Sequence, residues 1–199
     1  MSQLGVSNDS LIVIYDDANG MFAARMWWSL RYYGHTNTVI LAGGWKKWIA
    51  ENRPVTDEIT SREATHFDVQ IMPKIRRTID EVAEALDDEN VVLLDVRSLA
   101  EFNGEASRVE RAGHIPGAVN LSRKSLLDAD GHLPDVDTLK ATFASIGLHD
   151  PDQEVIVYCN GGVSASFGMV ALNTAGFNNV AVYDGSWKEW GRDASRPIE

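Results

Sequence analysis

One segment of the chain decides the fold: Val155-Ile156-Val157-Tyr158-Cys159-Asn160-Gly161-Gly162-Val163-Ser164-Ala165. Residues 155–158 are apolar and mostly β-branched, which predicts a buried strand, and residues 164–175 have the composition of a helix. Gly161 and Gly162 can adopt positive φ, so backbone N–H groups can converge at the helix N-terminus and hold an anion. Because such donors stabilise a thiolate, we predict that the only cysteine, Cys159, is a nucleophile rather than an inert buried thiol.

Composition places the chain among soluble globular proteins. It has 199 residues, of which 44% are hydrophobic, and a formal net charge of −11. The negative charge disfavours nucleic acid as a partner, and no apolar run approaches the ~20 residues of a membrane span. A single cysteine excludes an internal disulfide, and the N-terminus lacks the pattern of a secretory signal, so we expect a cytoplasmic protein.

The order of elements around Cys159 also occurs near the N-terminus. Tyr15 corresponds to Tyr158, and Trp45 corresponds to Trp187, at offsets of 143 and 142 residues. Such a repeat indicates two copies of one domain. The first copy comprises a predicted strand over 11–15, a helix over 22–33, a strand over 39–41 and a helix over 45–50; the second comprises 155–158, 164–175, 180–183 and 187–190.

The two copies are unequal in length. Only the second follows a further stretch with a predicted helix over 80–86, a buried strand over 91–94 and a helix over 136–146. We therefore expect an incomplete domain in residues 1–56, a polar linker over 57–73 and a complete domain in residues 74–199. An incomplete domain leaves apolar surface uncovered, which points to a shortened chain or, alternatively, to self-association.

Alternating strands and helices of these lengths predict an α/β fold with a mostly parallel central sheet and helices on both faces. Ligands of such sheets bind beyond the carboxyl ends of the strands. Cys159 and Arg97 each follow a predicted strand and therefore fall at this edge.

The chain resembles the tandem-domain rhodaneses, a family of sulfurtransferases. The resemblance covers residues 74–199 as the catalytic domain and residues 1–56 as the C-terminal half of a non-catalytic, rhodanese-like domain, in which Asp16 replaces the cysteine. It rests on Leu94-Asp95-Val96-Arg97, Glu101-Phe102-Asn103-Gly104-Glu105, Ala112-Gly113-His114-Ile115-Pro116-Gly117, Val157-Tyr158-Cys159 with its loop, Tyr183-Asp184-Gly185-Ser186-Trp187 and, in the first copy, Gly43-Gly44-Trp45.

The resemblance implies a two-step transfer in which Cys159 takes sulfane sulfur from a donor, forms a persulfide and passes the sulfur to cyanide or a thiol. Arg97 is the candidate for binding an anionic donor, with an ion pair to Glu101 or Glu105 as the alternative. We expect neither a metal nor a cofactor. The backbone N–H groups expected to bind the persulfide belong to Asn160, Gly161, Gly162, Val163, Ser164 and Ala165.

Three further residues are expected to support the site. Asp95 is expected to anchor the turn or the loop, His114 to make turn contacts rather than act as a base, and Ser186 to flank the loop. Partners are then a small-molecule sulfur donor and acceptor.

The sequence indicates the sulfur donor less clearly than it indicates the nucleophile. In the family, thiosulfate enzymes generally carry a cation, and 3-mercaptopyruvate enzymes a serine, at the position of Gly161. Glu101 stands where the mercaptopyruvate enzymes have an arginine, and a carboxylate there would repel that substrate. We expect thiosulfate as the donor, with 3-mercaptopyruvate as the alternative.

Two other function classes compete with this prediction. Phosphatases of the rhodanese-like fold close a longer loop with an arginine, where this chain has Ala165 and Ser166. The second class is a non-enzymatic persulfide carrier or binding module.

Overall fold

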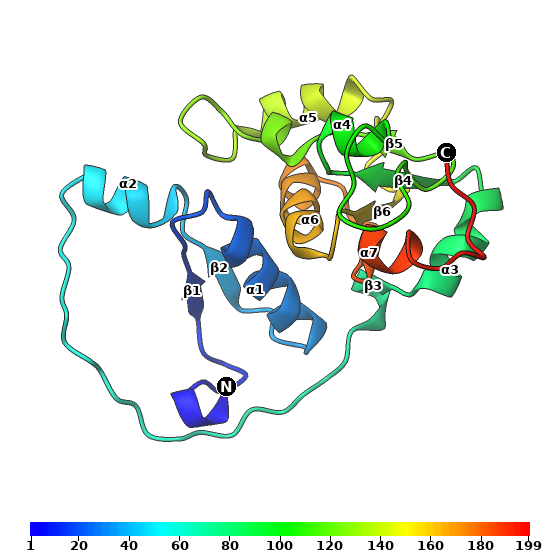
Figure 1. Cartoon of the computed structure of the whole chain (residues 1–199). Helices are drawn as coiled ribbons and strands as arrows, with labels where there is room; N and C mark the ends of the chain where they lie inside the picture. The colour runs from blue at the N-terminus through cyan, green and yellow to red at the C-terminus, as the bar shows by residue number, and fades with distance from the viewer. The chain divides into compact units, whose positions relative to one another are not determined.

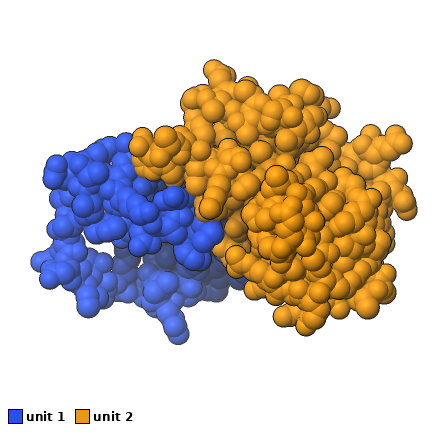
Figure 2. Space-filling model, turned by 45° about the horizontal axis from the view of Figure 1, so that its top comes forward, with its two compact units in different colours: residues 1–72 blue, residues 73–199 orange.

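The computed structural model describes all 199 residues. These divide into two compact units, residues 1–72 (unit 1) and residues 73–199 (unit 2) (Figure 2). No helix combines the length and the apolar character that crossing a bilayer requires.

Unit 2 is built on a sheet of parallel strands in the order β3-β7-β6-β4-β5 (Figure 1). The central strand β6 pairs with β4 on one side and β7 on the other, with Val157 opposite both Leu94 and Val182. The strands are β3 (Arg76–Arg77), β4 (Val91–Asp95), β5 (Val119–Asn120), β6 (Glu154–Tyr158) and β7 (Val180–Tyr183).

Helices cover both faces of this sheet, as predicted. Helices α5 and α6 pack against each other, and α3 packs against α7. Gly168 allows α6 to approach β6 closely, because a Cβ there would lie 2.9 Å from Cγ1 of Val157. The helices are α3 (Ile79–Glu84), α4 (Leu99–Phe102), α5 (Val136–Ala144), α6 (Val163–Ala175) and α7 (Ser186–Trp190), with 3₁₀ turns η2 (Pro73–Ile75), η3 (Ala85–Asp87) and η4 (Arg123–Leu126).

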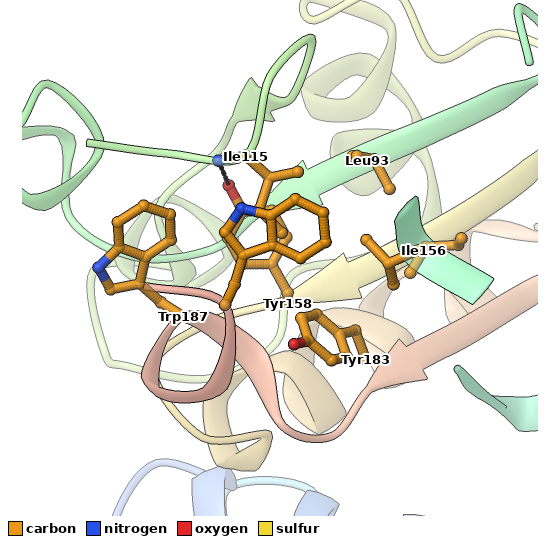
Figure 3. Close-up of a cluster of buried hydrophobic side chains, with 8 residues drawn as sticks. Leu93, Ile115, Ile156, Tyr158, Tyr183 and Trp187 are labelled. Carbon is orange, nitrogen blue, oxygen red and sulfur yellow. Dashed lines mark hydrogen bonds between the residues drawn. The ribbon is translucent and has the colours of Figure 1, made fainter. Parts of the chain in front are cut away.

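Alternate residues of β6 serve the two faces of the sheet, because successive side chains of a strand point in opposite directions. Val157 lies under α6, whereas Ile156 and Tyr158 join a buried cluster with the α7 tryptophans (Figure 3). The cluster comprises Val82, Leu93, Ile115, Ile156, Tyr158, Tyr183, Trp187 and Trp190. Side chains of this size each stabilise the fold by about 1.5–3 kcal/mol on burial.

Unit 1 has the same kinds of element in smaller number. Its two strands are parallel, with Val13 opposite Val39, and both of these side chains are about half exposed, at 51% and 48%. One face of this sheet therefore lacks a layer within unit 1. The elements are η1 (Ser2–Leu4), β1 (Ile12–Ile14), α1 (Met21–Tyr32), β2 (Thr38–Ile40) and α2 (Gly44–Ala50).

The predicted linker, residues 57–73, is not detached over its whole length. The N–H of Thr65 donates to the carbonyl of Ser2, and the N–H of Met72 donates to the carbonyl of Tyr32. The ring of Phe67 stacks on that of His35, 5.8 Å away. Residues from about Thr65 onward therefore pack on unit 1.

The predicted long elements are all present with shifts of one or two residues at their ends. The α/β fold is confirmed. Strands β3 and β5 were not predicted, because two residues are too few to show a period. Helix α4 was also missed, because it has only four residues, although its capping box, Ser98 with Glu101, is visible in the sequence.

Candidate active site

Cys159 follows β6 directly, at the carboxyl edge of the sheet in unit 2. The residue is buried, with 4% of its surface exposed, whereas the neighbouring Gly161 is exposed. The residue predicted to be a nucleophile is therefore almost fully buried. Cys159 lies beneath its loop, because α6 begins only four residues later and brings the chain back over it.

The loop is shaped by two residues with positive φ. Gly162 caps α6 with φ of 77°, and Ser186 has φ of 55° although it carries a side chain. Non-glycine residues rarely adopt this conformation, so other interactions must hold Ser186 in place. The buried hydroxyl of Ser186 provides them: it accepts hydrogen bonds from the N–H groups of Cys159 and Gly162, each 3.1 Å away, and donates to the carbonyl of Tyr183.

Helix α7 fixes the other side of the loop. The N–H of Trp187 donates to the carbonyl of Cys159 at 2.9 Å, and the N–H of Lys188 donates to the carbonyl of Asn160 at 3.1 Å. Both loop carbonyls are therefore held toward α7. Carbonyls held on one side leave the N–H groups of the following residues to face the other.

The loop N–H groups fall into two sets. That of Gly162 is used by Ser186, so it does not fit the predicted role in persulfide binding. No hydrogen bond within unit 2 uses the N–H groups of Asn160, Gly161, Val163 and Ala165. Val163 and Ser164 are half-buried and Ala165 is buried, all in the first turn of α6.

Arg97 follows β4 at the predicted edge of the sheet, but its side chain does not face solvent. Its guanidinium is buried, at 3% exposure, and pairs with both carboxylate oxygens of Asp95 at 2.6–3.1 Å. It also donates to the carbonyl of Gly113 and stacks over the Trp187 ring at 4.5 Å. The prediction that Arg97 binds an anionic donor disagrees with this geometry, because its charge is already neutralised and shielded from solvent. The partner is Asp95, not Glu101 or Glu105.

Asp95 connects the strand edge to the turn that follows α4. Burial raises the pKa of Asp95, and Arg97 opposes this only in part. Burial also raises the pKa of the neighbouring Tyr158 hydroxyl, which accepts a hydrogen bond from the N–H of Ile115 (Figure 3). Asp95, Arg97 and Tyr158 thus hold residues 113–115 against the sheet.

His114 makes turn contacts. Its Nδ1 lies 2.9 Å from the carbonyl oxygen of Phe102, and its ring stacks on the Phe102 ring. The backbone of His114 exchanges two hydrogen bonds with Glu199. None of these contacts reaches the loop of Cys159.

Two further side chains lie near the loop: Glu101, which the resemblance placed at the substrate site, and Lys188, which was not predicted to act there. Glu101 Oε1 accepts a hydrogen bond of 2.8 Å from the side chain of Asn160, and the Lys188 side chain lies beside Gly161. Burial acts to raise the pKa of Glu101, but donors from Asn160 and Ser98 outweigh it and the pKa is lowered. Sequence spacing gives no signal for either contact, because both depend on how distant segments meet.

One group of side chains has the ligand types of a metal site. Asp128, Asp130 and His132 each place one ligand atom within 4.8 Å of the others on the surface. The Asp128 carboxylate already accepts hydrogen bonds from the N–H groups of Asp130 and His132. The cluster is therefore explained as a turn.

Known proteins share the sequence pattern and the fold of this chain. The rhodanese-like domain family model matches residues 1–51 and 78–193. A putative thiosulfate sulfurtransferase of Haloferax volcanii is 37% identical over 98% of this chain and 71% of the relative. The sulfur carrier protein TtuD of Thermus thermophilus is 34% identical over 100% of this chain and 74% of the relative.

Solved structures give the same result. EanB in complex with ergothioneine matches 100% of this chain with a TM-score of 0.89 and 25% identity, and the chain spans 53% of that protein. SseA from Escherichia coli, described as a 3-mercaptopyruvate sulfotransferase, matches 93% of this chain and 70% of its own with a TM-score of 0.81 and 33% identity. The chain therefore belongs to the rhodanese-like domain family.

Proposed function

We propose that this protein is a sulfurtransferase that moves sulfane sulfur from thiosulfate to cyanide or a thiol through a persulfide on Cys159. Relatives named thiosulfate sulfurtransferase support the donor. A 3-mercaptopyruvate donor is the alternative. The carboxylate of Glu101 beside Asn160 does not separate the two donors, because both are anionic.

One observation carries the proposal: the equivalent loop of unit 1 holds an anion. There the carboxylate of Asp16 accepts four backbone hydrogen bonds of 2.8–2.9 Å, from the N–H groups of Ala18, Gly20, Phe22 and Ala23. The loop of Cys159 has the same helix-capping geometry, and several of its N–H groups have no acceptor. An anionic persulfide sulfur would supply one.

The reaction balances without a base or a cofactor. The Cys159 thiolate attacks the outer sulfur of thiosulfate, a new S–S bond forms, and the S–S bond of thiosulfate breaks as sulfite leaves with the electron pair. Cyanide then attacks the outer persulfide sulfur, which leaves as thiocyanate and restores the thiolate. One S–S bond adds about 2 Å, which carries the outer sulfur beyond the buried thiol.

The remaining assignments follow from this function. We propose residues 74–199 as the catalytic domain, 1–56 as half of a non-catalytic copy and 57–73 as the connection. We also propose a cytoplasmic location, and self-association that covers the exposed sheet face of unit 1.

Mass spectrometry tests the proposal. Incubation with thiosulfate should add about 32 Da to the peptide that contains Cys159, and cyanide should remove it. A protein that gains no mass, or gains it in Cys159→Ser, would contradict the persulfide mechanism.

A second candidate is persulfide delivery to a partner protein. It is supported by the similarity to TtuD, which is named a sulfur carrier protein. A carrier would load from thiosulfate but discharge slowly to cyanide and rapidly to a protein thiol. Comparing the two discharge rates separates the candidates.

A further inference from the structure

A thiosulfate donor carries two negative charges, so its binding requires a cation near the loop. The loop itself has none, since Gly161 stands at its exposed tip and Arg97 is buried in its pair with Asp95. The carboxylate of Glu101, which accepts a hydrogen bond from the Asn160 side chain, adds a negative charge beside the loop. The charge balance of the loop residues alone therefore opposes the proposed donor.

The side chain of Lys188 lies against the tip of this loop. A Cβ added to Gly161 would be 3.7 Å from the Lys188 Cδ, which is van der Waals contact. The backbone of Lys188 is fixed to the same loop, because its N–H donates to the carbonyl of Asn160. The ammonium group lies two bonds beyond Cδ, so Gly161 at the tip of the loop is within its reach.

Lys188 is also uncommitted. No carboxylate of unit 2 lies within ion-pairing distance of its ammonium group. The other cation near Glu101, Arg108, is mostly exposed and pairs with Glu101 at 3.3 Å. Arg108 thus offsets the charge of Glu101, whereas the charge of Lys188 remains available.

We propose that Lys188 is the donor-binding residue, whose ammonium group binds the sulfonate oxygens of thiosulfate while the outer sulfur meets Cys159. This inference rests on the proposed function. The same contact stabilises the negative charge that moves onto sulfite as the S–S bond of thiosulfate breaks.

The test is the rate of persulfide formation as a function of thiosulfate concentration, followed by mass spectrometry on the full chain. Lys188→Met keeps the alkyl volume and removes the charge, so the thiosulfate concentration for half-maximal rate should rise about fivefold or more. Lys188→Arg keeps the charge and should stay close to the native protein. Lys140→Met on α5 lowers the net charge equally, away from the loop, and should have no effect.

Ionic strength gives an independent readout. The half-maximal thiosulfate concentration of the native protein should rise with salt, and that of Lys188→Met should rise less. A half-maximal concentration in Lys188→Met that matches the native value, or an equal loss in Lys188→Arg and Lys188→Met, would overturn the role of Lys188 while leaving the persulfide mechanism intact. A native protein that forms no persulfide at all would overturn both.

Discussion

The loops that begin at Asp16 and Cys159 share a backbone design and differ in what fills it. Each follows a parallel strand, and each precedes a helix capped by a glycine with φ of 77°. In each, the N–H of the tryptophan at the next helix, Trp45 or Trp187, donates to the carbonyl of the loop's first residue. In unit 1 a carboxylate occupies the ring of N–H donors, whereas in unit 2 a thiol stands at the same place and donors remain open.

The residue that faces each loop from the following helix also differs between the two units. Gly44 and Ser186 occupy equivalent positions and have nearly the same φ, 57° and 55°. A Cβ at Gly44 would lie 2.4 Å from the carbonyl oxygen of Asp16, whereas Ser186 places its hydroxyl under the loop. The comparison teaches that one fold element can serve as a self-filled structural loop or as a proposed binding site. The two loops differ in these two side chains and in length, the loop of unit 1 being one residue longer.

The largest expected effect comes from making the second loop like the first. In Cys159→Asp the new carboxylate should occupy the loop donors, so persulfide formation should disappear and turnover should fall at least about a thousandfold. Thermal unfolding should change little, and Cys159→Ser is the matched control. Residual sulfur transfer in either variant would show that the loop is not the site.

The next effect concerns a buried pair in unit 2. Arg97→Met leaves the Asp95 carboxylate buried without its partner and should lower the free energy of unfolding by about 3–5 kcal/mol. Urea denaturation followed by tryptophan fluorescence measures the loss. The double variant Asp95→Asn with Arg97→Met should lose less, since no buried charge remains; an equal loss would argue against the ion pair as the cause.

Asp16→Asn tests the loop of unit 1, in which the Asp16 carboxylate accepts the backbone hydrogen bonds. An amide cannot accept from four N–H groups, so unit 1 should lose about 2 kcal/mol, read as faster hydrogen exchange in residues 18–23. Burial acts to raise the pKa of Asp16, but the backbone donors outweigh it and the pKa is lowered. The contribution of Asp16 is therefore complete at neutral pH and is lost as the pH falls below about 4, where native and variant proteins should converge.

The smallest effect separates strain from hydrogen bonding at Ser186. Both Ser186→Gly and Ser186→Ala lose the hydroxyl, and both should form the persulfide more slowly because the loop is no longer tied. Alanine keeps the unfavourable positive φ, so Ser186→Ala should be less stable than Ser186→Gly by about 1 kcal/mol. Equal melting temperatures would contradict the idea that the hydroxyl holds a strained backbone.

The sheets of the two units also differ in how far their side chains are covered. Ile156, Tyr158 and Trp187 are buried in unit 2, whereas their counterparts Val13, Tyr15 and Trp45 are substantially exposed. In unit 2 the covering residues come from α3, β4 and the turn at Ile115. The repeat in the sequence revealed the correspondence, and the structure shows which side chains lack a cover within unit 1.

The elements of the site could be predicted where local pattern was strong. Strand β6, helix α6 and Cys159 between them follow from composition and glycine placement. The pairing of Asp95 with Arg97 was missed, although residues two apart in an extended segment point the same way and Asp-x-Arg allows it. Burial decided between a surface ligand and an internal pair, and burial at that position depends on the turn at Gly113.

The sequence by itself determined the α/β fold, the repeat, and a cysteine at a strand-to-helix junction, because these depend on residue type and spacing along the chain. Only the tertiary structure decided that Arg97 faces inward, that Ser186 ties the loop and that Lys188 lies over Gly161. These contacts join residues brought together by strand order and helix packing, which no local pattern specifies.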